Sequence, residues 1–265
     1  MFFRDSGKII LWIGIDFLTT GEGEMAMYFF ATQWELPEGV GFSLFGPIHL
    51  AWIGAIGVGT ALGLLLLQGR PRAQAVAAKV GAVLSVLLVL LLEVWFWWQD
   101  DFTVWSLPLH LCELTPFLLL LFELTRWDWV GQTLYCLCLP GSVAALLFPN
   151  WTMFPQWNVV NLQGFLLHAL LVFCPLLELQ RGAIIPRFGH MWKAWAFLAV
   201  VTPPIYLFNL RFGTNYFFLN AGSPGSPLEW LIVRMGNPGF LLGYAAIALA
   251  VTAGMYLPRL FGGNK

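Results

Sequence analysis

The 265-residue chain is too apolar to be a water-soluble protein. Hydrophobic residues make up 59% of it and charged residues only 10%, whereas soluble domains contain about 25% charged residues. The net charge of −1 provides no basic surface for nucleic acid, so a nucleic-acid partner is excluded. The composition therefore predicts an integral membrane protein.

Long apolar stretches predict an all-α fold, a polytopic membrane helix bundle of about seven transmembrane helices. About 20 such residues rise about 30 Å as a helix, which is enough to cross the hydrocarbon core. The expected spans cover residues 45–68, 80–98, 107–125, 129–148, 161–180, 191–211 and 239–258. They divide the chain into an N-terminal extension, residues 1–41, and a single membrane domain, residues 42–265.

The loop charges predict the orientation of this bundle. Nine of the 13 Lys and Arg residues lie on one side of the expected spans and four on the other. The positive-inside rule then places the C-terminus in the cytoplasm and the N-terminus outside. Within the extension, Ile9–Leu18 is too short to span and contains Asp16, which favours an interfacial helix on the outer face. A removed signal peptide is the weaker alternative.

Two histidines occupy near-identical settings. His49 follows Pro47 and His110 follows Pro108, each at the expected start of a span entering from the outside. Proline suits the first helical position because it has no N–H to leave unpaired. Each histidine is then expected in a first turn, where the helix dipole disfavours the imidazolium form. Both rings should stay neutral.

Further polar side chains are expected at the same depth. Glu113 lies three residues after His110, on the same helical face, and Glu93 lies near the outer end of the second span. Asn161 and His168 share a face of the fifth span. Ionisable groups inside a membrane are costly and usually face a cavity, so this cluster is a candidate functional site. The plainer alternative is that each histidine is a structural hydrogen-bonding group.

The longest outer loop, residues 212–238, begins with Gly213-Thr214-Asn215-Tyr216 and continues into a turn-rich segment. It could fold back as a lid that brings Asn215 to the histidines. An interfacial aromatic anchor followed by a connecting turn is the alternative.

Short motifs give the chain a resemblance to a known family. They are Phe42-Ser43-x-x-Gly46-Pro47-x-His49-Leu50, Leu107-Pro108-Leu109-His110-Leu111-Cys112-Glu113, Leu147-Phe148-Pro149, His168 and Thr214-Asn215-Tyr216. In their order and spacing these motifs resemble the YwaF-like family of bacterial integral membrane proteins, from about residue 42 to residue 258. That family is similar to eukaryotic membrane acyltransferases acting on lyso-ether phospholipids, and more distantly to membrane hydrolases of fatty-acid esters. The resemblance implies a multi-pass protein of the cell membrane.

The resemblance also implies roles for individual residues. His110, His168 and Asn215 match positions at the relatives' site. Leu109 stands where the relatives carry their presumed cysteine nucleophile, which excludes a covalent acyl-enzyme at that position. Cys112 is no obvious substitute, because two residues along a helix it faces another way.

The leading hypothesis is therefore a lipid acyltransferase, transacylase or acyl-ester hydrolase with its site in the outer half of the membrane. His110 or His168 would act as general base, Glu113 would orient the imidazole beside it, and Asn215 would donate to the oxyanion. The substrate would be a membrane phospholipid or lysophospholipid, and no cofactor is expected. Side chains expected to contact it are His49, Glu93, Asn161 and Tyr216.

Two other functions remain open at this point. Three imidazoles, from His49, His110 and His168, could hold zinc in an intramembrane amidase or esterase, although no close His-x-x-x-His spacing supports it. A transporter or receptor-like bundle could instead use the polar cluster as a ligand or proton site, although no inverted repeat is visible.

Overall fold

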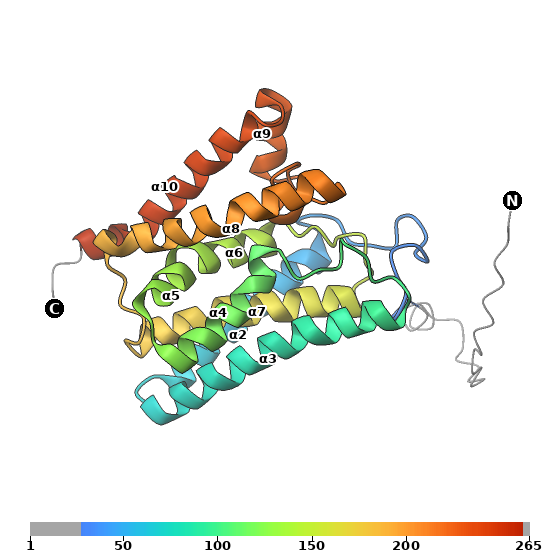
Figure 1. Cartoon of the computed structure of the whole chain (residues 1–265). Helices are drawn as coiled ribbons and strands as arrows, with labels where there is room; N and C mark the ends of the chain where they lie inside the picture. Colours follow the sequence, from blue (N-terminus) through green and yellow to red (C-terminus); the bar gives the residue numbers. More distant parts are fainter. Residues whose placement is uncertain (1–27, 262–265) are drawn as a thin grey trace, which may run out of the picture.

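The computed structural model describes residues 28–261, and the regular elements in that range are all helices, without strands (Figure 1). Six helices in this range are long and apolar enough to cross a membrane. They are α2 (Pro47–Leu67), α3 (Pro71–Trp98), the composite segment Asp128–Leu147, α7 (Val159–Gln180), Phe188–Phe212, which includes α8 (Met191–Phe212), and α10 (Phe240–Phe261). The polytopic helical bundle is therefore confirmed.

The third expected span, residues 107–125, is a shorter helix than predicted. The helix α4 runs over Leu111–Thr125, only 15 residues, and rises about 22 Å. His110 is its N-cap, with an extended backbone at φ −68° and ψ 153°. The expectation that Pro108 opens this helix and that His110 lies in the first turn was wrong, whereas Pro47 does begin α2.

The most buried span is built from three helical pieces. The helix α5 (Asp128–Thr133) continues into the π-helix η1 (Leu134–Cys138), which is followed by α6 (Leu139–Leu147). Pro140 offers no N–H to the preceding turn, and a widened π turn accommodates such a missing bond. All five residues of η1 are buried, and they form the centre of the main apolar core with residues of α3, α4 and α7.

The remaining elements surround this central span. The helices α2, α3 and α7 lie together at one side of the bundle, while α8 crosses the opposite side (Figure 1). The short helix α9 (Pro227–Met235) packs against α10, and the pair lies beyond α8 in this view. The C-terminal end of α3 and the N-terminal ends of α4 and α7 lie at the same end of the bundle, where the sequence predicted the polar site.

Part of the expected N-terminal extension packs on this same end. The Asn158 side chain, the N-cap of α7, donates to the carbonyls of Tyr28 and Ala31 at 2.8 and 2.9 Å. The expected interfacial helix over residues 9–18 lies outside the described residues. Residues 28–46 thus form non-helical turns that close over the start of α7.

Ion pairs tie the helices at the opposite end of the bundle. The buried carboxylate of Glu178, on α7, accepts from Arg126 and Arg181, both at 2.9 Å. Arg126 also bonds Glu123. Because α4 and α7 contribute these partners, their register is fixed at this end as well.

Candidate functional site

His168 carries a ring nitrogen that is free to act as a base. Its Nδ1 lies 2.7 Å from the carbonyl oxygen of Gly164, one turn earlier on α7. A carbonyl only accepts, so Nδ1 carries the proton and Nε2 presents a lone pair. Nε2 is buried and has no hydrogen-bond partner among the described residues. Such orphaned groups are rare in proteins and mark places where a ligand or water belongs.

Trp151 holds the imidazole of His168 from its face. The two rings are stacked, with 5.1 Å between centroids and 25° between planes. The indole fits there because residue 164 is glycine: a Cβ on Gly164 would come within 2.8 Å of the Trp151 ring. Packing and a backbone bond together fix the direction in which Nε2 points.

Other unpaired polar atoms come from the residues expected in this cluster. The carbonyl oxygen of the Asn161 side chain and one carboxylate oxygen of Glu93 are buried without a partner in the described chain, as is the indole N–H of Trp151. Asn161 uses its amide nitrogen on the Gln156 carbonyl, at 2.8 Å. A buried unpaired polar group costs about 1–3 kcal/mol, so each of these atoms is a position at which a polar ligand or a water would be stabilising.

His110 presents the complementary form of imidazole. The backbone N–H of Phe217 donates to its Nδ1 at 3.3 Å, so the proton of the neutral ring resides on Nε2. The ring lies between Tyr216 and Phe218, with centroid distances of 5.0 and 5.2 Å. One histidine thus offers an acceptor and the other a donor.

Glu113 contacts His110 at the start of α4. Its carboxylate accepts from the backbone N–H of His110 at 2.8 Å, which caps the start of α4. In return, the His110 side chain accepts from the backbone N–H of Glu113, so the two residues cap the helix reciprocally.

The loop after α8 folds back toward His110, but the residue that contacts the imidazole is Tyr216 and not the expected Asn215. Asn215 turns away: its amide donates to the Ala221 carbonyl at 3.0 Å, and its oxygen accepts from the Asn220 and Ala221 N–H groups. It therefore shapes the loop and does not face the histidines. Tyr216 comes forward instead, donating its hydroxyl proton to the Val104 carbonyl at 2.7 Å.

Asn209, on α8, holds this loop in place. Its amide donates to the Tyr216 carbonyl at 2.8 Å, and its oxygen accepts from the Tyr216 N–H at 2.9 Å and the Thr214 hydroxyl at 2.8 Å. The next residues, Phe217 and Phe218, both have positive φ, 59° and 54°. Non-glycine residues in this region persist only where surrounding contacts enforce them, and they concentrate at functional sites.

His49 does not join the cluster. Its Nε2–H donates to the Leu146 carbonyl at 2.7 Å and its Nδ1 accepts from the Phe45 N–H at 2.9 Å. With both nitrogens occupied and the ring fully buried, His49 ties α2 to α6. His49 therefore has no free ring nitrogen with which to make the expected contact with substrate.

The same bonds contradict the zinc site expected from His49, His110 and His168. Across the described residues, no group of three histidine, cysteine or acidic side chains is arranged to hold a metal ion. The four cysteines are free thiols, and Cys136, Cys138 and Cys174 are buried.

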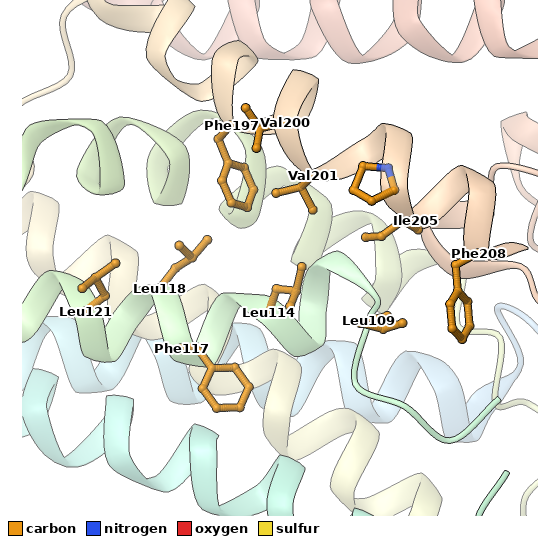
Figure 2. Close-up of a pocket in the computed structure, with 11 residues that line it drawn as sticks. Leu109, Leu114, Phe117, Leu118, Leu121, Phe197, Val200, Val201, Ile205 and Phe208 are labelled. Carbon is orange, nitrogen blue, oxygen red and sulfur yellow. The ribbon is translucent and has the colours of Figure 1, made fainter. Parts of the chain in front are cut away.

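An apolar groove runs along the bundle between α4 and α8. It has a volume of about 620 Å³, and its walls are formed by α4, through Leu114 and Leu118, and by α8, through Val201 and Ile205 (Figure 2). Leu109, the neighbour of His110, lies at one end. Every lining residue is apolar, and the groove is open to the side, where Val200 is 73% exposed.

Together these features define a polytopic helical membrane protein, and His110 and His168 remain the candidate site residues. The chain belongs to the TMEM164 family, whose sequence model matches residues 44–256, most of the described bundle. No curated protein sequence and no solved structure shows a significant match to it.

Sequence reasoning missed three contributors to this site: Trp151, Asn209 and Phe217. An asparagine within an apolar span is a signal that could have singled out Asn209, since such residues are costly in a membrane. Trp151 carries no such signal, because tryptophans are common near membrane interfaces, and the contribution of Phe217 is a backbone N–H, which no side-chain pattern reveals.

Proposed function

We propose that the protein is a membrane-embedded enzyme that hydrolyses or transfers the acyl group of a lipid ester, with a phospholipid or lysophospholipid as substrate. The observation that carries the proposal is the unpaired Nε2 of His168, a neutral base held rigidly in a buried polar cluster. General base catalysis by such a group contributes about 10²–10⁴-fold to rate.

The two imidazoles have different roles in the proposed reaction: His168 is the general base and His110 is the oxyanion donor. His168 Nε2 removes the proton from a water or lipid hydroxyl, whose oxygen then attacks the ester carbonyl carbon. His110 Nε2–H donates to the oxyanion that forms, a role expected earlier for Asn215. As the ester C–O bond breaks, the leaving alcohol takes the proton from His168. Water gives a free fatty acid, and a lysolipid hydroxyl gives a transferred acyl chain.

The groove between α4 and α8 suits the acyl chain of such a substrate. Its walls are wholly apolar, it begins at Leu109 beside His110, and it is open to the side where a membrane lipid would enter. An ester bond held at His110 would leave its chain to follow Leu114 and Val201 along the bundle. Glu93 and Asn161, with their unpaired oxygens, would bind hydroxyl groups of the glycerol or the attacking water.

Direct transfer, without a covalent intermediate, is the form of the reaction that we favour. The resemblance to the YwaF-like family and to membrane acyltransferases supports acyl chemistry, but Leu109 replaces the relatives' presumed nucleophile. A mechanism in which water or a lipid hydroxyl attacks directly needs only the base and the oxyanion donor.

The decisive experiment is lipid analysis with purified protein in vesicles of phosphatidylcholine containing lysophosphatidylethanolamine. Wild-type protein should produce free fatty acid, diacyl phosphatidylethanolamine or both, measured by mass spectrometry. His168→Ala should lose at least about 100-fold of this activity, while Cys112→Ala, a substitution on neighbouring α4, should retain it. If wild-type protein leaves every lipid unchanged, or His168→Ala stays active, the proposal is wrong.

A further inference from the structure

A second cavity lies at the end of the bundle away from His168. Its volume is about 690 Å³, and it is found where α5 and α8 begin. Its walls include three indoles, those of Trp127, Trp129 and Trp192, together with the charged side chains of Asp128 and Lys193. The 15 residues of α4 separate it from His110, a rise of about 22 Å.

The charges in this cavity are one carboxylate and one ammonium, side by side. Asp128 accepts from Lys193 Nζ at 2.6 Å, and from His190 Nδ1 at 2.8 Å. Neither partner of the Asp128–Lys193 pair is fully buried: their side chains are 38% and 26% exposed. Each can therefore meet an opposite charge on a ligand without first being brought out of the protein interior.

The indoles add a preference for a cation. Trp127 and Trp192 are 52% and 63% exposed, and the rings of Trp127 and Trp129 lie 6.3 Å apart, tilted by 33°. Indole faces attract ammonium groups, and clusters of them recognise quaternary ammonium ligands. An amphipathic ring of this kind also favours the level of lipid headgroups.

An apolar path leads out of the cavity. Phe197 and Val200, on α8, line both this cavity and the groove between α4 and α8. A ligand with a polar head among the indoles could therefore lay a hydrocarbon chain along α8. Charge and shape together require a molecule with one positive group, one negative group and a long apolar tail.

We propose that this cavity binds a zwitterionic glycerophospholipid, with its ammonium between the indoles and Asp128, its phosphate at Lys193 and an acyl chain over Phe197 and Val200. An anionic phospholipid without an amine offers nothing to the indoles or to Asp128, and it brings a negative charge beside that carboxylate. The site is separate from the histidine cluster and does not depend on the proposed catalytic function.

The test is native mass spectrometry of the full-length protein in detergent, with dioleoylphosphatidylcholine or dioleoylphosphatidylglycerol added in equal amounts. Phosphatidylcholine should remain bound more tightly. Trp192→Leu should weaken it about three- to tenfold, and Trp192→Phe should weaken it less, because phenylalanine keeps a smaller π face. Trp98→Leu, at a tryptophan that is 77% exposed at the C-terminal end of α3, should leave binding unchanged.

A further variant separates this site from the catalytic one. Phosphatidylcholine should bind His168→Ala as tightly as wild type and should bind Lys193→Gln more weakly. Equal or tighter binding of phosphatidylglycerol to wild type would overturn the proposal, as would binding that Trp192→Leu leaves unchanged. Loss of the bound lipid in His168→Ala would also overturn it, since the lipid would then occupy the histidine cluster.

Discussion

The imidazole of His168 lies stacked on the indole of Trp151, and the carbonyl of Gly164 holds the edge of the same imidazole at 2.7 Å. The ring can neither tilt nor rotate without breaking one of these contacts. The free Nε2 is therefore a base with a defined direction, and the contacts that define it can be altered individually.

Gly164→Ala should disturb this direction without touching the imidazole. The new methyl would meet the Trp151 ring at 2.8 Å, so the indole must move. A misplacement of about 1 Å at a catalytic group can cost about 100-fold in rate, whereas alanine partly offsets the packing strain by its better helix propensity. We expect a large fall in lipid turnover with a small change in Tm. Gly57→Ala, with no atom near the added methyl, is the control, and equal activity of the two variants would contradict the prediction.

The two histidines should behave as one unit. If His168 supplies the base and His110 the oxyanion donor for the same reacting ester, losing either removes most of the catalysis, and losing both costs little more. The test is to measure lipid turnover by three variants side by side: His110→Ala, His168→Ala and the double variant. The difference between the double loss and the sum of the single losses is the coupling free energy between the two histidines. Strictly additive losses in the logarithm of the rate would place the two residues in separate roles.

Asn209→Ala should release the loop that brings Phe217 to His110. The substitution removes three hydrogen bonds from a fully buried side chain, and we expect a loss of stability of about 2–4 kcal/mol. Hydrogen exchange should rise over residues 213–221. Asn237→Ala, which removes one exposed bond to Asn220, should change it little. Unaltered exchange in Asn209→Ala would show that other contacts hold the loop.

Val201→Phe should narrow the groove between α4 and α8. Val201 lines the groove opposite α4 (Figure 2), so the larger ring would occupy space needed by a long acyl chain. We expect turnover of long-chain esters to fall more than turnover of short-chain esters. Leu207→Phe adds a similar ring on the same helix at a side chain that is 65% exposed. An unchanged chain-length preference in Val201→Phe would place the acyl chain elsewhere.

The class of fold can be predicted from the amino-acid sequence alone. Composition and apolar runs require a membrane bundle because about 20 apolar residues in a row have few other stable environments. The ionisable residues Glu93, His110 and His168 could be selected as a cluster for the same reason, since charges within a membrane need a shared interior. The orientation, from the loop charges, stays a prediction.

Which of these residues face one another depends on packing between segments that are far apart in the sequence. His49 and His110 look alike in sequence, yet His49 uses both ring nitrogens on the backbone of neighbouring segments and His110 lies under the loop after α8. The Leu146 carbonyl lies 97 residues from His49 in the sequence, and the Phe217 N–H lies 107 residues from His110. A local pattern cannot contain such information, because a histidine's tautomer and its free nitrogen depend on which backbone groups the fold brings beside it.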